Sequence, residues 1–380
     1  MKLDHIDTMR GLAILMVILV HTAACVPGLS VDLQEATYYG MLGVQLFFVA
    51  SAFTLCHSGM QRQGETRPLL SYAIRRYFRI APMYYIGIVL YAGMSLLNNY
   101  VIERRLAFGA EYTLSSVMAN VFFVHGLVPG PANNAVVPGG WSIGTEMAFY
   151  AVFPLLFAAF LKVRAFTLRL AGLIVLASLV ASQATLWAVF QLTGLKASTG
   201  SFIYFSIANQ LPVFVMGMVL FFLTREDRWP IKSIWGNAAG FIAFTAATAF
   251  KLSQRDGNDS LIPVLGGASF VFLFKVLEAA KPLNPAWIRA IGKVSFSMYI
   301  VHFIFAYKVT LMASRVLVPA IGSGAAAMVL YAVAVAGSYL AAVIAQRLVE
   351  ARFIGLGKQL IARLRTRPQP REAVAPPTVL

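Results

Sequence analysis

The sequence predicts an all-α fold: a polytopic bundle of transmembrane helices with about ten spans and one short segment that is re-entrant or half-buried. Hydrophobic residues make up 59% of the chain and charged residues only 12%, whereas a soluble domain usually carries about 25% charged residues. The mean hydropathy is +0.73. A chain of 380 residues can supply about ten spans of roughly 20 residues with short loops.

The distribution of charge and the two cysteines argue against nucleic-acid binding, a disulfide framework and a metal site. The net charge is +16, but the basic residues cluster in a few loops and in the C-terminal segment. Cytoplasmic loops that face anionic lipid have this pattern, so we expect membrane lipid and no nucleic acid as a partner. Cys25 and Cys56 both lie in apolar segments, so neither a disulfide framework nor a metal site is predicted.

Eleven apolar segments follow one another along the chain. Asp4 and Asp7 dilute the basic region that a signal peptide would need, and Thr22 stands where a lipidation site usually has leucine. The first segment is therefore interpreted as an uncleaved span. The candidate segments are about 7–27, 38–58, 80–100, 114–128, 141–161, 168–190, 208–224, 233–251, 260–280, 294–314 and 322–346.

Basic loops decide the orientation. Residues 59–79 hold five arginines, which places this loop in the cytoplasm. The segment 114–128 has only about 15 residues, short for a span. If it does not cross, all later basic clusters also fall on the cytoplasmic side. We therefore expect ten spans in the cytoplasmic (inner) membrane, with both termini cytoplasmic and 114–128 re-entrant or half-buried on the outer side.

The chain is expected to form one transmembrane domain over residues 1–346, followed by a basic, Pro-rich cytoplasmic tail over 347–380. Within the tail, the segment 366–380 is typical of disorder. No internal repeat is evident, which argues against a repeat-built transporter.

Arg10 and His21 lie on the first apolar segment, eleven positions apart. On an α-helix this spacing is about 1,100° of rotation and about 16 Å of rise, so both side chains share a face. Ionisable groups within a membrane are costly and usually functional. With the expected orientation, Arg10 lies towards the cytoplasm and His21 in the outer half.

Glu146 lies five positions after Trp141, at a depth expected to match His21. A carboxylate that meets the imidazole would set its tautomer and raise its basicity, as a general base requires. The alternative is a structural ion pair that holds two helices together.

Three arginines precede the third span: Arg75, Arg76 and Arg79. Arg76 and Arg79 share a helix face. Together with Arg10 they could clamp phosphate groups, which arginine binds in a bidentate manner. The alternative is ordinary anchoring by cytoplasmic positive charge.

Further polar residues lie within the apolar segments. Ser295, Tyr299 and His302 are at helical spacing, and His302 is expected to line the site rather than to act directly. Gln45 and Ser51 either line a cavity or join helices. His57 and His125 are assigned no role.

Five motifs in order resemble the acyltransferase 3 family of membrane-bound O-acyltransferases that modify extracytoplasmic glycans. The resemblance covers about residues 3–346, and Ala52 departs from a frequent glycine. The motifs are "LDHIDTMRGLAILMVILVHTA" with Arg10 and His21, "GVQLFFVASAF", "RRYFRIAPMYY" with Arg76 and Arg79, "PGGWSIGTEMAFYAVFPLL" with Trp141, Ser142, Glu146 and Tyr150, and "IGKVSFSMYIVHFIF".

This resemblance implies transfer of an acyl group, usually acetyl, from cytoplasmic acetyl-CoA to a carbohydrate hydroxyl on the far side. His21 would be the base or a transient acyl carrier, and Glu146 would assist the chemistry or the acceptor. Arg10, Arg76 and Arg79, with Arg75 beside them, would hold the CoA phosphates. The residues expected to line the substrate path are Gln45, Ser51, Trp141, Ser142, Tyr150, Tyr299 and His302.

The resemblance leaves the acceptor open: lipopolysaccharide O-antigen, exopolysaccharide, peptidoglycan or a glycolipid. Some family members carry a fused periplasmic domain that completes the transfer. We expect this chain to act directly or through a separate periplasmic transferase. The competing function is a transporter or flippase that uses the same charges as an ion or substrate pathway. A sensor or structural membrane protein is a third alternative.

Overall fold

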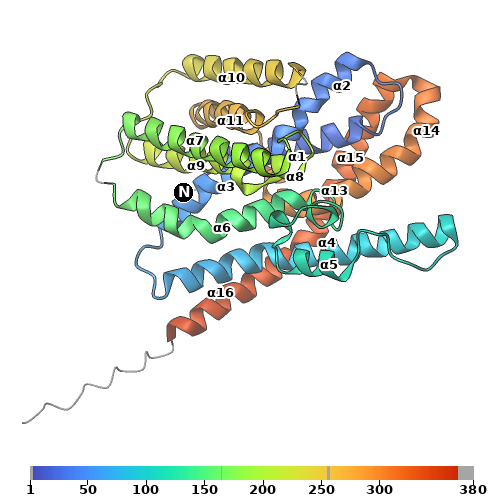
Figure 1. The fold of residues 1–380 in the computed structure, drawn as a ribbon, viewed down its shortest axis with the longest axis horizontal. Helices are drawn as coiled ribbons and strands as arrows, with labels where there is room; N and C mark the ends of the chain where they lie inside the picture. Colours follow the sequence, from blue (N-terminus) through green and yellow to red (C-terminus); the bar gives the residue numbers. More distant parts are fainter. Residues whose placement is uncertain (1–2, 164, 255–256, 367–380) are drawn as a thin grey trace, which may run out of the picture.

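The computed structural model describes residues 3–163, 165–254 and 257–366, and every regular element in them is helical. The predicted all-α bundle is confirmed (Figure 1). Within the described residues, nine helical stretches are long and apolar enough to cross a membrane. The long helices are α1 (Asp4–Ala23), α3 (Gly43–Met60), α4 (Pro68–Glu103), α6 (Gly140–Leu161), α7 (Leu168–Thr193), α9 (Ile207–Arg225), α10 (Ile234–Gln254), α11 (Ile262–Ala279), α14 (Thr310–Ile321), α15 (Ser323–Ala345) and α16 (Ala351–Thr366).

One predicted span is not among those nine. Helix α10 has 21 residues, which is long enough to cross a bilayer, but Asn237, Thr245 and Lys251 lower its hydropathy. It packs along α11, where Thr245 and Ser269 share a hydrogen bond of 2.8 Å (Figure 1). Helix α10 therefore belongs to the bundle through a polar contact with α11.

Shorter elements connect the long helices. Helix α13 (Ser295–Phe303) continues into α14 through the π-helix η5 (Ile304–Val309), and α15 continues into α16 through the π-helix η6 (Gln346–Glu350). The remaining elements are α2 (Val31–Tyr38), η1 (Tyr39–Leu42), α5 (Leu114–Val121), η2 (His125–Leu127), η3 (Pro131–Asn133), α8 (Phe202–Phe205), η4 (Lys281–Leu283) and α12 (Ala286–Lys293).

The segment 114–128 does not cross, as predicted. Helix α5 has eight residues, which is about 12 Å of rise and too short for a span. The segment is instead held against α4 and the start of α6: Tyr84 donates to Asn120 Oδ1 at 2.6 Å, and His125 Nε2 lies 2.9 Å from the Gly140 carbonyl oxygen. Burial lowers the pKa of His125.

The first part of the predicted C-terminal tail is helical. Residues 346–366 continue as helix, and α16 packs on α4, where Gly357 lies against the ring of Phe78. Residues 367–380, which hold most of the Pro-rich stretch, lie outside the described residues.

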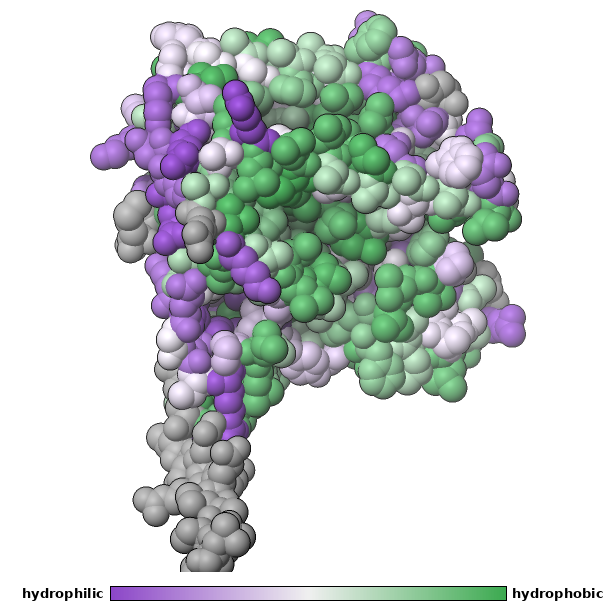
Figure 2. Space-filling model, turned by 60° about the vertical axis from the view of Figure 1, so that its left-hand side comes forward, coloured by the Kyte–Doolittle hydropathy of each residue, from purple (hydrophilic) through white to green (hydrophobic). Residues whose placement is uncertain are grey.

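Polar and apolar surfaces are segregated. Figure 2 shows a hydrophobic band between two hydrophilic margins, which is the pattern of a protein that spans a bilayer. In Figure 1 the start of α1 and the end of α16 lie at the same side of the bundle.

Helix α1 is held by a close backbone contact with α12. A Cβ atom at Gly292 would overlap the carbonyl oxygen of Asp7, and one at Gly11 would overlap the carbonyl oxygen of Ile288. Small residues let membrane helices approach to backbone contact. The contact fixes α1 against α12 at Gly11, the residue directly after Arg10.

We expect Gly292→Ala to lower the free energy of unfolding by about 1–3 kcal/mol, because the added methyl group forces α12 away from α1. The measurement is the thermal unfolding midpoint of the purified protein in detergent. Gly172→Ala on α7 is the matched control, since nothing lies within 4 Å of its Cβ position. Equal unfolding midpoints for the two variants would contradict a stabilising role of the close contact between α1 and α12.

Candidate functional site

Two cavities open within the bundle. The outer cavity has a volume of about 1000 Å³, and His21, Gln45 and Trp141 are among its lining residues. The inner cavity has a volume of about 70 Å³ and is lined by Arg10, Glu146 and others. Val44 and Tyr299 line both, so a thin layer of side chains separates the two.

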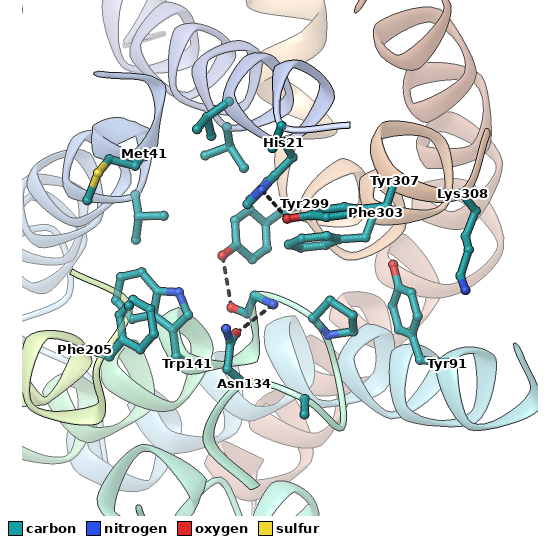
Figure 3. Close-up of a pocket in the computed structure, with 18 of the residues that line it drawn as sticks. His21, Met41, Tyr91, Asn134, Trp141, Phe205, Tyr299, Phe303, Tyr307 and Lys308 are labelled. Carbon is teal, nitrogen blue, oxygen red and sulfur yellow. Dashed lines mark hydrogen bonds between the residues drawn. The ribbon is translucent and has the colours of Figure 1, made fainter. Parts of the chain in front are cut away.

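His21 lies at the wall of the outer cavity, near the end of α1. Its Nδ1 atom is 3.1 Å from the hydroxyl of Tyr307 (Figure 3), and its ring lies 4.6 Å from that of Phe303 between centroids. Tyr307 belongs to the π-helix η5, whose wider turn changes the face on which its side chains emerge. A π-turn in this position is typical of a functional site.

A second histidine lies behind the first. The rings of His21 and His302 are 5.5 Å apart between centroids. His302 Nδ1 donates to the carbonyl oxygen of Tyr299 at 2.6 Å, and its Nε2 atom has no hydrogen-bond partner among the described residues. His302 is fully buried and lines neither cavity, so it packs behind the site that it was expected to line.

Glu146 lies in the inner cavity, away from His21. Its Oε1 atom accepts hydrogen bonds from Ser51 Oγ at 2.6 Å and from the Tyr150 hydroxyl at 2.5 Å. The expected contact between His21 and Glu146 is therefore not formed. The reason is that the polar loop before α6 is buried against α4, so α6 begins inside the protein and carries Glu146 to the middle of α3, where Ser51 lies.

Arginines from two helices line the same cavity as Glu146. Arg10 of α1 donates to Thr54 Oγ1 at 3.3 Å, and the Arg76 guanidinium lies 5.7 Å from the centre of the Tyr150 ring. Arg79 lines the same cavity. Three guanidinium groups against one carboxylate leave this cavity positive, which suits an anionic ligand.

Arg75 does not join this group. Its guanidinium donates to both carboxylate oxygens of Glu65, at 3.2 and 2.9 Å. The residue was expected to bind CoA phosphates with its neighbours, but its charge is neutralised in the loop between α3 and α4. The structure therefore leaves Arg10, Arg76 and Arg79 as the residues that could hold an anion.

The layer between the cavities is hydrogen-bonded. Ser142 Oγ donates to the Tyr299 hydroxyl at 2.8 Å. That hydroxyl donates to the Gly139 carbonyl oxygen at 3.0 Å, the bond drawn below Tyr299 in Figure 3. Gly139 has φ +76°, and a Cβ atom there would lie 2.8 Å from the ring of Phe303. Glycine is thus required at this position.

The structure divides the remaining predicted lining residues between the cavities. Gln45 and Trp141 line the outer cavity, and Ser51, Ser142 and Tyr150 line the inner one.

Sequence reasoning missed several residues of the outer cavity. One set follows the outer half of α4 at helical spacing: Tyr91, Met94, Ser95, Asn98 and Asn99. Polar residues at i, i+4 and i+7 within an apolar run are a signal that could have revealed this face. Tyr307 carries no such signal, because its direction depends on the π-turn.

Comparisons with known proteins agree with this architecture. A family model described as an acyltransferase domain matches residues 3–344. The peptidoglycan O-acetyltransferase OatA of Listeria monocytogenes serovar 1/2a is 25% identical over 323 residues, which is 78% of this chain and 48% of that protein. The chain thus spans about half the length of this curated relative. No solved structure matches the chain significantly.

Because a side-chain layer separates the cavities, we expect cysteines in them to be labelled from opposite faces of the membrane. In a Cys25→Ser, Cys56→Ala background, Met41→Cys lies in the outer cavity and Thr54→Cys in the inner one. A membrane-impermeant methanethiosulfonate should modify Met41→Cys, but not Thr54→Cys, when added to the outer face of oriented vesicles. Equal labelling of both from that face would show one continuous cavity.

Proposed function

The chain belongs to the acyltransferase 3 family, and on that premise we propose that it moves an acetyl group from cytoplasmic acetyl-CoA to a hydroxyl of a cell-surface or periplasmic glycan. The observation that carries the proposal is the pair of cavities. A small, positively charged cavity on the side of Arg10 adjoins a large, wide cavity that holds His21. This arrangement suits a charged donor and a bulky acceptor that approach from opposite faces.

The donor would bind at the arginines. The inner cavity of about 70 Å³ cannot hold the nucleotide of CoA, so the phosphates would remain at its cytoplasmic mouth. Arg10, Arg76 and Arg79 would bind them there, and Glu65 keeps Arg75 out of this role. The thin pantetheine arm would then extend along α1 over the rise of about 16 Å that separates Arg10 from His21.

The acceptor would meet the thioester at His21. When Nδ1–H donates to the Tyr307 oxygen, Nε2 keeps a lone pair and can accept the proton of a sugar hydroxyl. The sugar oxygen attacks the thioester carbonyl, the C–S bond breaks, and the proton passes to the CoA thiolate. A variant of this path has His21 itself carry the acetyl group between the two substrates. In both, the apolar bundle excludes water that would hydrolyse the thioester.

The curated relative is named for peptidoglycan, which supports a polysaccharide acceptor; O-antigen and exopolysaccharide have the same reacting hydroxyl chemistry. We place the protein in the cytoplasmic membrane with both termini inside, in accord with its basic loops. A separate periplasmic transferase is the alternative recipient of the acetyl group.

His21→Ala should abolish acetyl transfer, because it removes the base or carrier at the junction of donor and acceptor. The measurement is mass analysis of surface glycans from cells that carry no protein, wild type or the variant, combined with glycan-dependent CoA release from labelled acetyl-CoA. The variant must remain in the membrane at the wild-type level. Wild-type acetylation by the variant would overturn the role of His21, and substrate movement without any CoA release would favour a transporter.

Arg79→Ala should raise the KM for acetyl-CoA about 10- to 100-fold, since a charge-assisted hydrogen bond to phosphate contributes about 1.5–3 kcal/mol. Arg79→Lys should restore part of this affinity because it keeps the charge. Arg352→Ala, an exposed cation on α16, is the control and should leave KM unchanged. Identical increases in KM for Arg79→Ala and Arg352→Ala would show that only the total surface charge matters, which would contradict phosphate binding by Arg79.

A further inference from the structure

One end of the outer cavity is built from aromatic and amide side chains. The rings of Trp141 and Phe205 stack with centroids 4.2 Å apart and planes 16° apart. Gln45 and Tyr204 also line the cavity here. We name these four residues the aromatic corner. In Figure 3, Trp141 and Phe205 lie together on one side of His21 and Tyr299.

The aromatic corner contains polar atoms that lack partners. Gln45 Oε1 and the Tyr204 hydroxyl have no hydrogen-bond partner among the described residues, although each residue is only 1% exposed. Trp141 lies beside them, and in Figure 3 its Nε1 atom is on the side of the ring turned to Tyr299. A buried polar group without a partner is costly, because it has lost its hydrogen bonds to water and gained none in the protein. Two such atoms at one end of the cavity indicate a ligand that supplies the missing partners.

Gln45 Oε1 and the Tyr204 hydroxyl do not hydrogen-bond to each other, because other hydrogen bonds fix the Gln45 side chain and the backbone of α8. Gln45 Nε2 donates to Gln210 Oε1 at 3.0 Å, and Gln210 Nε2 donates to the Tyr204 carbonyl oxygen at 2.8 Å. Thr145 Oγ1 donates to the Phe205 carbonyl oxygen at 2.7 Å. Helices α3, α6 and α9 thereby position α8 as a rigid wall.

The corner carries no net charge. Its four residues have neither a carboxylate nor an amine, whereas Lys308 lines the cavity on the opposite side of His21 (Figure 3). The carboxylate of Glu111 accepts a hydrogen bond from Ser95 Oγ at 3.4 Å. Ser95 lies one helical turn after Tyr91, and Figure 3 shows Tyr91 on the same side of the cavity as Lys308. An aromatic platform edged by an uncharged donor and acceptors fits a neutral ring that has one apolar face and several hydroxyls.

We infer that the aromatic corner binds a neutral hexopyranose ring. The apolar face of the ring stacks on Trp141, one hydroxyl donates to Gln45 Oε1, and others bond to the Tyr204 hydroxyl and Trp141 Nε1. The inference rests on the proposed function only in identifying this ring as part of the glycan acceptor. A ring held there directs the continuing glycan chain past His21.

The test measures sugar binding to the purified full-length protein in detergent, without acetyl-CoA. The probes are maltotetraose, chitotetraose, mannotetraose and galactotetraose, with tetragalacturonate as an anionic probe of the same length. At least one neutral probe should raise the thermal unfolding midpoint and bind at least tenfold more tightly than tetragalacturonate.

Tyr204→Phe removes only the unpartnered hydroxyl. Without sugar, its unfolding midpoint should be at or above that of the wild type, and its Kd for the neutral probe should rise about tenfold, which corresponds to about 1.4 kcal/mol. Ser182→Ala removes an unpartnered buried hydroxyl from α7, outside both cavities. This control should bind the sugar as the wild type does.

The inference is overturned if no neutral probe binds, if tetragalacturonate binds as tightly, or if Tyr204→Phe keeps the wild-type Kd. Because acetyl-CoA is absent, these results do not depend on catalysis. Sugar binding without any acetyl transfer would contradict the proposed function alone. Acetyl transfer that is unaffected by Tyr204→Phe, together with an unchanged Kd, would contradict the aromatic corner alone.

Discussion

The position of Glu146, half-buried among apolar helices, is the constraint on which the rest of the site depends. A carboxyl group is tolerated in such a place when hydrogen bonds and nearby opposite charge replace its hydration. Ser51 and Tyr150 supply the hydrogen bonds, and Arg10, Arg76 and Arg79 line the same cavity. Helices α1, α3, α4 and α6 must therefore converge on one point. That convergence closes the inner cavity and keeps it apart from the outer one.

Helix α1 joins the two cavities because it contributes an ionisable side chain to each. Arg10 reaches the inner cavity and His21 the outer cavity, and the backbone contact of Gly11 and Gly292 keeps the helix from rotating between them. At the outer end, the π-turn of η5 brings Tyr307 to His21. A rotation of α1 that improved one contact would break the other, so both groups are positioned by the same packing.

Apolar runs and helical spacing were sufficient to predict the bundle and a shared face for Arg76 and Arg79, and segment length together with the basic loops predicted that 114–128 does not cross. They could not give the depth of Glu146, because that depth depends on where α6 begins. Asn120 and His125 determine this through hydrogen bonds to residues far along the chain. The pairing of Arg75 with Glu65 could not be predicted for a similar reason. The two side chains meet only because the loop between α3 and α4 folds back, with Arg67 in a left-handed conformation. Local sequence patterns do not predict contacts of this kind, because the contacts depend on the tertiary fold.

The thin layer between the two cavities is the feature of the architecture that best suits the proposed acyl transfer. In the proposed function, the thioester must be protected from water until an acceptor hydroxyl is in place, and the donor and the acceptor would come from different aqueous phases. A wide barrier would separate the substrates as well as the solvents. The Ser142–Tyr299–Gly139 hydrogen bonds instead form a barrier one side chain thick. Because Gly139 has no side chain, Tyr299 and Phe303 can pack directly on the backbone there.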